Sequence, residues 1–245
     1  MNIALFGYGK MGKLIEKLAG EYDAEIVAIV DPLQGREFSA AELKDADVCI
    51  DFTEPGAALE NIQNIAKAGK NIVIGTTGWY DEIEKVKKIV MNNNIGLLYG
   101  SNFSIGMNMF YSIVAHTAQF IDQLPEYDIY GMEQHHSEKK DSPSGTARVL
   151  SDILCESIER KKRPQYDRID RKPDNEELHF ASMRAGSIPG THTVGFDSKA
   201  DTIELTHRAR SREGFARGAL IGARWLQDKT GIFDFREEFK EIISS

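Results

Sequence analysis

Cysteine is scarce in this sequence, because only 2 of its 245 residues are cysteines. Cys49 and Cys155 form no C-x-x-C pair and each lies in an apolar stretch, so we expect neither a disulfide framework nor a zinc-thiolate site. No apolar run approaches the ~18 residues that a membrane-spanning helix needs. The first residues reach Gly7 without the basic segment, long apolar segment and cleavage site of a secretory leader. We therefore expect a cytoplasmic protein with no membrane partner.

An excess of positive charge is also missing. The sequence has 30 Lys and Arg against 38 Asp and Glu, which gives a formal net charge of -8. This balance repels polyanions, so we expect no nucleic acid partner. The sequence contains no internal repeat, and 41% of its residues are hydrophobic, which is enough for a buried core without covalent staples. Any anionic ligand must therefore meet positive charge that is placed locally.

The first hundred residues alternate short β-branched runs with segments of helical period. The runs predict strands at residues 2–6, 25–30, 47–52, 71–74 and 95–99, and the segments predict helices at 10–19, 57–68 and 81–93. This alternation is typical of βα units that build a parallel sheet. We predict an α/β, Rossmann-like, doubly wound domain over residues 1–104, to which residues 214–245 return with a last helix near 214–226.

The pattern changes after residue 104. The expected elements are helices at 105–123, 144–160 and strands at 127–134, 178–183, 191–196 and 202–206. Residues 135–143 form a polar segment, and the charged, proline-containing residues 161–177 are expected to form an exposed loop. Successive short strands without intervening helices favour an antiparallel or mixed sheet. We therefore predict a second, α+β domain over residues 105–213. His116, on the apolar first helix of this domain, is expected to be packed.

A glycine-rich turn lies between the first expected strand and the first expected helix. Residues 7–12 read G-Y-G-K-M-G, which matches the G-x-G-x-x-G spacing of dinucleotide-binding folds. The first glycine permits the tight turn, the second lets the backbone approach a pyrophosphate, and the third lets helix and strand pack closely. The phosphates would then meet N–H groups at the helix N-terminus. Asp31, at the end of the second strand, is the expected acid for the ribose hydroxyls.

The same turn nearly matches a second motif, since residues 7–13 also read G-x-x-x-x-G-K. Leu14 stands where a Walker loop needs Ser or Thr to hold magnesium, so a dinucleotide is favoured over a nucleoside triphosphate. A carboxylate beside the ribose favours NADH, and Pro32 occupies the next position, where a basic residue would favour NADPH. Arg36 and Lys10 could still supply positive charge. We therefore expect NADH and leave the use of NADPH open.

Residues 133–147 bring a proton donor, cations and a helix start together. Small residues at 144–146 begin the expected helix, where outward N–H groups leave room for an anion such as a carboxylate. Lys139 adds positive charge, and a histidine such as His135 can donate a proton to a developing anion. Each feature also has an ordinary interpretation, because a serine before a helix is usually an N-cap and neighbouring lysines usually face solvent.

Two other chemistries lack their patterns in this segment. The adjacent His135 and His136 have no carboxylate or third histidine at H-E-x-x-H spacing, so we expect no metal site. Ser144 lies outside any G-x-S-x-G elbow, so we do not expect it to be a nucleophile.

The run E-x-H-H-x-x-K-x-D-x-P-S-G-T-A at 133–147 resembles the signature of the 4-hydroxy-tetrahydrodipicolinate reductase family, also called dihydrodipicolinate reductase, of the diaminopimelate route to lysine. Further motifs resemble the family in order and spacing over essentially the whole chain: G-x-G-x-M-G at 7–12, G-T-T-G at 75–78, N-F-S-I-G at 102–106, R-A-G at 184–186, G-T-H at 190–192 and L-T-H-R-A-R-S-R at 205–212. Two departures, a phosphate turn one glycine shorter than in many members and Pro32 after the ribose acid, concern the preferred cofactor.

The resemblance implies NAD(P)H-dependent reduction of 4-hydroxy-tetrahydrodipicolinate to tetrahydrodipicolinate with loss of water. It implies that His135 is the general acid or base, and that Lys139 is the second proton donor and substrate anchor. The implied substrate-binding residues are His136, Ser144, Gly145 and Thr146. The implied cofactor-binding residues are Gly7, Tyr8, Gly9, Lys10, Met11, Gly12, Asp31, Gly75, Thr76, Thr77, Gly100, Ser101, Asn102 and Phe103, of which the last four would form a hinge.

The family also implies a homotetramer assembled through the sheet of the second domain, which would bind a small dicarboxylate. Two other functions stay open on the residues alone. One is a different Rossmann dehydrogenase, acting on an aldehyde or a sugar, and the other is a nicotinamide-binding sensor. The small-residue helix start and the clustered cations favour a small dianion over a neutral sugar.

Overall fold

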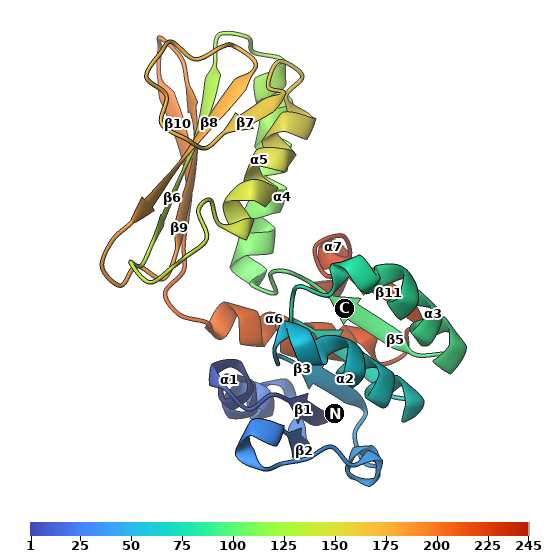
Figure 1. Cartoon of the computed structure of the whole chain (residues 1–245). Coiled ribbons are helices and arrows are strands. Elements are labelled where there is room, and N and C mark those ends of the chain that lie inside the picture. Colours follow the sequence, from blue (N-terminus) through green and yellow to red (C-terminus); the bar gives the residue numbers. More distant parts are fainter. Residues whose placement is uncertain (245) are drawn as a thin grey trace. The chain divides into compact units, whose positions relative to one another are not determined.

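The chain folds into two compact units, whose elements are labelled in Figure 1. The computed structural model describes residues 1–244. One unit consists of Met1–Ile105 with the chain from Arg212 onward, and the other consists of Gly106–Ser211. The roles that we expect for these two units remain predictions.

The first unit contains a six-stranded parallel sheet in the order β11-β5-β4-β3-β1-β2. Its strands are β1 (Asn2–Phe6), β2 (Glu25–Val30), β3 (Val48–Asp51), β4 (Asn71–Ile74), β5 (Gly96–Tyr99) and β11 (Gly231–Asp234). The chain reverses its direction of travel across the sheet between β1 and β3. In open α/β sheets ligands bind at the carboxyl ends of the strands beside such a switch point.

Helices cover both faces of this sheet, which confirms the doubly wound fold. They are α1 (Lys10–Ala19), α2 (Pro55–Lys67), α3 (Ile83–Asn93), α6 (Glu213–Leu226) and the short α7 (Phe239–Ile242), with 3-10 turns at Gly20–Tyr22, Pro32–Gln34, Ala40–Leu43 and Tyr80–Glu82. Ile3 and Leu5 of β1 pack in one core cluster with α1 and α6. Ala4 and Phe6 pack in the other cluster with α2 and α3. Side chains that alternate along a strand therefore supply both cores.

Two elements of this unit were not predicted from the sequence. β11 pairs in parallel with β5 at the edge of the sheet, and α7 follows it. Each has only four residues, which is too short to show a period. Their structure depends on packing: Phe235, just after β11, is fully buried and its ring lies 4.6 Å from that of Phe103.

The second unit contains a five-stranded mixed sheet in the order β10-β9-β6-β8-β7, as the sequence predicted. Its strands are β6 (Asp128–His135), β7 (Arg163–Gln165), β8 (Glu177–Arg184), β9 (Thr191–Asp197) and β10 (Thr202–Arg208). β8 runs parallel to β6 and β7, whereas β9 runs antiparallel to β6 and β10. The prediction of a loop over residues 161–177 was wrong in part, because this segment contains the strand β7. An edge strand of three residues with a central proline gives no periodic signal.

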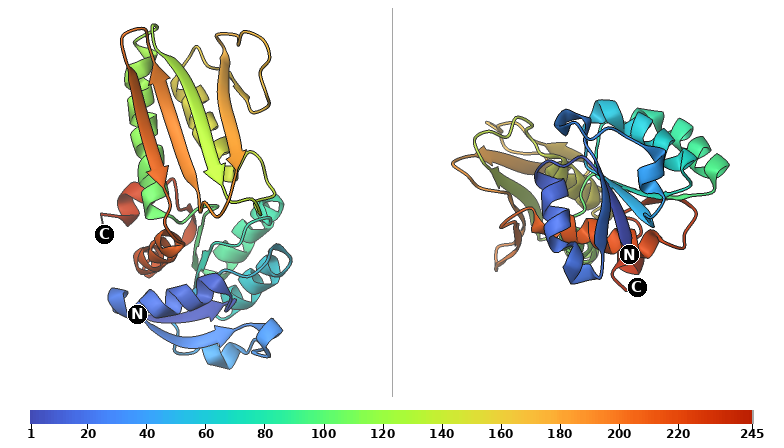
Figure 2. Two further views of the ribbon diagram at one scale, coloured as in Figure 1. Left: turned by 90° about the vertical axis from the view of Figure 1, so that its left-hand side faces the viewer. Right: turned by 90° about the horizontal axis from the view of Figure 1, so that it is seen from below.

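Two helices, α4 (Ile105–Asp122) and α5 (Gly145–Ser157), pack on the same face of this sheet. Figures 1 and 2 both show the other face without a covering helix. Along β6, buried residues alternate with partly exposed ones, so that Ile129 and Glu133 face the helices while Tyr130 and Met132 face the opposite side. Within residues 106–211 the sheet therefore has one core face and one open face.

The prediction that His116 is packed in the core was also wrong, because this residue is exposed. The buried face of α4 includes Met107, Val114 and Ala118, and the helical period places His116 away from it. Its ring stands edge-on to that of Phe120, 5.0 Å away. Among residues 1–244, no helix combines the length and the apolar character needed to cross a membrane, and both cysteines are free thiols.

Candidate active site

The glycine turn joins β1 to α1, and packing requires two of its three glycines. Gly7 has a φ of 86°, and a Cβ there would lie 2.7 Å from the carbonyl oxygen of Phe52. A Cβ at Gly12 would lie 2.3 Å from the carbonyl oxygen of Gly7. Around Gly9, in contrast, a Cβ would meet no atom of the described residues within 4 Å apart from those of Gly9 and its two chain neighbours. Gly9 therefore leaves open space above the N-terminus of α1.

Asp31 is held directly against this turn. Its Oδ2 accepts hydrogen bonds from the backbone N–H of Tyr8 at 2.7 Å and from the side-chain amide of Gln34 at 2.8 Å. The residue is 7% exposed and bridges to Arg36 through its backbone. Two features separated by more than twenty residues, the turn and the acid, thus meet as a ribose and pyrophosphate site would require.

Two cationic side chains lie over the ring of Tyr8, which is next to Asp31. The Arg36 guanidinium lies 4.9 Å from the ring centroid, and Lys13 Nζ lies 5.6 Å from it. The Tyr8 hydroxyl donates to Glu16, and this hydrogen bond raises the pKa of Tyr8. Arg36 is therefore a cation that the structure places near Asp31, the predicted ribose acid, where the following position, Pro32, supplies none.

A buried carboxylate connects the ends of β3 and β4. Asp51 Oδ1 accepts from the N–H and hydroxyl of Thr53, at 2.9 and 2.7 Å, and from the hydroxyl of Thr76 at 2.8 Å. Its Oδ2 accepts from the Asn61 amide at 2.8 Å. Burial raises the pKa of Asp51, and these hydrogen bonds oppose the shift. Asp51, which sequence reasoning missed, thus fixes the loop that carries Gly75, Thr76 and Thr77.

Phe52 joins the predicted cofactor segments to one another. Its carbonyl oxygen lies beside Gly7, and its ring lies where a Cβ at Gly75 would approach to 2.2 Å. The ring also packs edge-on to Phe103, 6.0 Å away. The turn at 7–12, the loop at 75–77 and the segment at 100–103 are therefore neighbours within one unit. No pattern in the sequence singles out Phe52.

In the second unit, sheet register assembles a cluster around Glu133. His135 is the last residue of β6 rather than part of a polar loop, and it lies on the same face as Glu133 because side chains two apart in a strand share a face. His192 of β9 pairs directly opposite Glu133. Glu133 is 0% exposed, His135 7% and His192 4%. These groups are consequently held away from bulk water.

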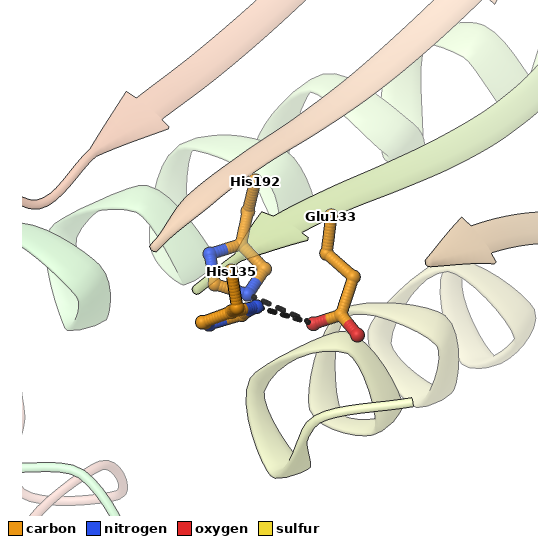
Figure 3. A group of neighbouring side chains, drawn as sticks. All are labelled: Glu133, His135 and His192. Atoms are coloured by element: carbon orange, nitrogen blue, oxygen red, sulfur yellow. Dashed lines mark ion pairs between the residues drawn. The ribbon is translucent and has the colours of Figure 1, made fainter. Parts of the chain in front are cut away.

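The Glu133 carboxylate divides its two oxygens between different partners. Oε2 lies 3.3 Å from Nδ1 of His135 and 3.5 Å from Nε2 of His192, and the dashed lines of Figure 3 meet at this one oxygen. Oε1 accepts from three donors: the N–H of Ser144 at 3.0 Å, the Ser182 hydroxyl at 2.8 Å and Arg184 Nη2 at 2.9 Å.

These partners keep Glu133 ionised. Burial alone would raise the pKa of its carboxyl, but the nearby His135, His192, Ser144 and Arg184 outweigh burial and hold the pKa well below its usual range. Burial lowers the pKa of His192, so its ring is neutral near pH 7. The cluster therefore holds a carboxyl group that favours its charged form beside a histidine, His192, that favours its neutral form.

The helix start of α5 lies beside this cluster. Ser144 is the N-cap, since its Oγ accepts the N–H of Ala147 at 3.1 Å, and Oγ also lies 3.4 Å from Nε2 of His192. No described atom lies within 4 Å of a Cβ position at Gly145. The first N–H groups of a helix have no intrahelical partner and favour anions. The structure thus brings the helix start at Gly145 and Thr146 next to the residues around Glu133.

Lys139 and His136 lie in the loop between β6 and α5. Lys139 Nζ forms an ion pair with Asp141 at 2.7 Å, and the Lys139 N–H donates to the carbonyl of His136. The Asp141 carbonyl in turn accepts from Arg184. The loop is therefore tied to Glu133 through Arg184, and its lysine is partly exposed.

The same cluster has the composition of a metal site. The ligand atoms of Glu133, His135 and His192 all lie within 4.8 Å of one another, and all three residues are buried. The H-E-x-x-H spacing could not indicate this group, because His192 lies on another strand, β9. The expected absence of a metal therefore stays a prediction.

Comparison with known proteins matches the chain over both units. The family model of the N-terminus of dihydrodipicolinate reductase matches residues 1–103, and that of the C-terminus matches residues 106–238. The chain belongs to the dihydrodipicolinate reductase family. A 4-hydroxy-tetrahydrodipicolinate reductase of Christiangramia forsetii is 39% identical over 246 residues, with 100% of each chain covered. One of Methanoregula boonei is 35% identical, covering 94% of this chain and 93% of the relative.

Solved structures show the same fold. A dipicolinate-bound dihydrodipicolinate reductase from Paenisporosarcina sp. TG-14 has a TM-score of 0.76 at 20% identity, covering 97% of this chain and 98% of that one. An amine dehydrogenase from Mycobacterium smegmatis has a TM-score of 0.60 at 10% identity, covering 95% and 94%. The family models and the curated relatives confirm the family resemblance that the sequence motifs indicated.

Sequence reasoning named His135 but gave no role to three residues of its cluster, Glu133, Arg184 and His192. Glu133 opened the family motif, while Arg184 and His192 lay in two short motifs that carried only the resemblance. Their signal was the alternation of strand residues around 133 and 192, which predicts a shared face but not which strands are neighbours.

Proposed function

We propose that this protein reduces 4-hydroxy-tetrahydrodipicolinate to tetrahydrodipicolinate with a nicotinamide dinucleotide, in the diaminopimelate route to lysine. One hydride and one proton enter the substrate, and its hydroxyl leaves as water. The observation that carries the proposal is the membership of the whole chain in the dihydrodipicolinate reductase family. The buried His135 beside a helix N-terminus supports it, because reduction of a dianion needs a proton donor and an anion site.

We assign cofactor binding to the first unit. Open space at Gly9, the tight packing at Gly7 and Gly12 and the carboxylate of Asp31 fit a dinucleotide. When bound, the nicotinamide would supply the hydride. The residues assigned to the cofactor are Gly7, Tyr8, Gly9, Lys10, Met11, Gly12, Asp31, Gly75, Thr76, Thr77, Gly100, Ser101, Asn102 and Phe103. Asp31 favours the free ribose hydroxyls of NADH, while Arg36 offers charge to the phosphate of NADPH.

We assign substrate binding and proton transfer to the second unit. The N-terminus of α5, at Ser144, Gly145 and Thr146, would bind one carboxylate of the substrate. His135 would donate the proton. Lys139 would exchange its exposed partner Asp141 for a second carboxylate, and His136 would contact the ring. Positive charge would thus meet a dianion locally in a protein whose net charge is -8.

The open face of the second unit's sheet supports a homotetramer. Tyr130, Gly195 and Glu204 form one row across it, and the Tyr130 hydroxyl donates to Glu204 at 2.7 Å. Met183 on the adjacent strand is 48% exposed. A sheet face of this composition is suited to association with further copies of the chain, and light scattering of the purified protein tests it. We also propose a cytoplasmic location, in keeping with the free thiols.

The decisive test generates the unstable substrate in place. The upstream synthase, pyruvate and aspartate semialdehyde are mixed with this protein, and oxidation of NADH and of NADPH is followed separately. Oxidation that depends on the synthase, with the greater rate for NADH, is expected. Absence of oxidation with either cofactor, from folded protein that still binds nucleotide, would favour another dehydrogenase or a nicotinamide-binding sensor.

A further inference from the structure

We propose that Gln34 is a positioning residue for the choice of cofactor, because it fixes Asp31 so that one carboxylate oxygen is offered to the free hydroxyls of the NADH ribose. The proposal rests on the proposed function, in which the first unit binds a nicotinamide dinucleotide and Asp31 contacts its ribose. Gln34 belongs neither to the glycine turn at 7–12 nor to any of the family motifs. It acts on the cofactor through Asp31.

The chain turns back on itself directly after β2. The carbonyl oxygen of Asp31 accepts from the N–H of Gln34 at 2.9 Å and from that of Arg36 at 3.0 Å, and the Asp31 N–H donates to the carbonyl of Arg36 at 2.8 Å. Pro32 begins the short 3-10 turn, and Gly35 ends it with a φ of 71°, which glycine adopts without strain. The turn thereby returns the side chain of Gln34 to that of Asp31.

The side-chain amide of Gln34 meets two acceptors. Its Nε2 lies 2.8 Å from Oδ2 of Asp31 and 3.1 Å from the carbonyl oxygen of Tyr8. A carboxylate oxygen and a backbone carbonyl both accept hydrogen bonds, so the NH2 group must occupy this position, and each of its two hydrogens has a partner. Gln34 therefore joins the predicted ribose acid to the glycine turn.

The two oxygens of the Asp31 carboxylate differ in their partners. Oδ2 accepts from the N–H of Tyr8 at 2.7 Å as well as from Gln34, whereas Oδ1 accepts a hydrogen bond from no other group among residues 1–244. Two donors on one oxygen fix the direction of the whole carboxylate. Asp31 is 7% exposed, and Oδ1 is the acceptor that remains for a ribose hydroxyl.

A carboxylate fixed in this way distinguishes the two cofactors. A ribose hydroxyl donates a charge-assisted hydrogen bond to Oδ1, whereas the 2′-phosphate of NADPH meets the same oxygen as a like charge. Without Gln34, the N–H of Tyr8 is left as the donor on Oδ2, and the carboxylate can rotate away from the ribose. NADH then loses part of its hydrogen bond, and NADPH loses part of the repulsion. Removal of the Gln34 amide should therefore shift the preference toward NADPH.

Gln34→Met keeps the length of the side chain and removes both donors, and Gln34→Ala serves the same test if the first variant does not fold. Gln227→Met is the matched control, because Gln227 is an exposed glutamine at the end of α6 in the same unit, and its side chain bonds to no other described residue. Asp31→Asn removes the charge through which Gln34 acts. Combining it with Gln34→Met completes a double-mutant cycle, which shows whether the two residues act together.

Fluorescence titration in the absence of substrate measures the Kd of NADH and of NADPH. In Gln34→Met we expect the Kd of NADH to rise by about 3- to 10-fold, while that of NADPH stays within about twofold or falls. The kcat at saturating NADH should not change, because Gln34 is assigned to the ribose that Asp31 contacts and not to the nicotinamide. Gln227→Met should match the wild type with both nucleotides. In the Asp31→Asn protein, adding Gln34→Met should change the ratio of the two Kd values by less than about twofold.

Three results would overturn the proposal. An equal loss of affinity for both nucleotides would show that Gln34 only supports the turn, and unchanged affinity for both would remove its role. The same shift of preference in the Asp31→Asn protein would show that Gln34 does not act through Asp31. Circular dichroism shows whether each variant is folded.

The same titration separates this proposal from the proposed function. A folded wild type that binds NADH but does not oxidise it in the synthase-coupled assay contradicts the proposed function alone, and the Kd values of the variants still decide the role of Gln34. A folded wild type that binds neither nucleotide overturns the role of Gln34 together with the assignment of the cofactor.

Discussion

Asp51 and Glu133 are both 0% exposed, yet their neighbours give them opposite electrostatic properties. Asp51 accepts hydrogen bonds only from neutral hydroxyl, amide and backbone donors, and burial raises its pKa. Glu133 has Arg184 and two imidazoles beside it, and its pKa is lowered. Burial by itself therefore does not decide the charge of a carboxyl. The surrounding groups decide it: burial among neutral donors leaves the pKa of Asp51 raised, whereas His135, His192, Ser144 and Arg184 together lower the pKa of Glu133.

The surroundings of Glu133 and those of Asp51 are expected to differ most in their importance for catalysis. His135→Ala removes the proposed proton donor next to Glu133, so kcat should fall by about 10²- to 10⁴-fold while NADH affinity is unchanged. Lys139→Ala should both raise substrate KM and lower kcat, because the lysine is assigned to anchoring as well as proton donation. Synthase-coupled kinetics and NADH fluorescence titration measure these quantities. Near-normal kinetics in both variants would contradict the assigned roles.

Stability should separate the two carboxylates next. Glu133→Ala leaves the Ser144 N–H, the Ser182 hydroxyl and the partly buried Arg184 without their shared acceptor, which is expected to cost about 3–5 kcal/mol of unfolding free energy. Asp51→Asn keeps an acceptor for the Thr53 and Thr76 donors and mismatches only the Asn61 amide, so the expected cost is about 1–3 kcal/mol. Urea unfolding of both variants compares them directly. Equal costs would show that the charged partner Arg184 does not make Glu133 more important to stability than Asp51.

Alanine substitutions at two glycines of the same turn, Gly9 and Gly12, should differ in their effect on stability by a smaller amount. Gly12→Ala places a methyl group against the carbonyl of Gly7 and is expected to destabilise by about 1–3 kcal/mol. Gly9→Ala meets no protein atom, so its stability should stay within about 0.5 kcal/mol of wild type while NADH binding weakens. Thermal unfolding with and without NADH distinguishes the two. A Gly9→Ala protein with full NADH affinity would remove Gly9 from the proposed cofactor site.

The contributions of Glu133 and Asp51 to stability should change with pH in opposite directions. The lowered pKa of Glu133 stabilises the fold above the ordinary value of 4.5, and this contribution is lost as pH falls below it. The raised pKa of Asp51 gives a contribution that is present below its ordinary value of 3.8 and is lost as pH rises through the folded value. On acidification, the stability advantage of wild type over Glu133→Gln should therefore shrink, and that over Asp51→Asn should grow. Urea unfolding across acidic pH would contradict this if both differences moved together.

The smallest effect is expected at the ribose acid. Arg36→Ala removes the cation stacked on Tyr8, so kcat/KM should fall for NADPH more than for NADH, by an amount of the order of tenfold or less for a single exposed charge pair. The ratio of the two values in the coupled assay measures it. A fall of equal size for both cofactors would show that Arg36 supports the turn rather than selecting the cofactor.

Much of the first unit could be predicted from the sequence because its signals are local. The strand at residues 2–6, the helix at 10–19 and the glycine spacing between them are set by side-chain period and by turn sterics within twenty residues. The N-cap at Ser144 was local for the same reason, and the structure shows its hydrogen bond to Ala147. Edge elements such as β7 and β11 could not be predicted, since they exist only through pairing with β8 and β5.

By itself the sequence determined the two-part α/β architecture, the glycine turn between β1 and α1 and the position of His135 in a family motif. Only the tertiary structure decided what surrounds His135. His192 lies 57 residues after it, and strand register alone sets that histidine opposite Glu133. A shift of register by one residue would turn every side chain of the strand to the other face. The chemistry of His135 therefore depends on contacts between strands, which no local pattern contains.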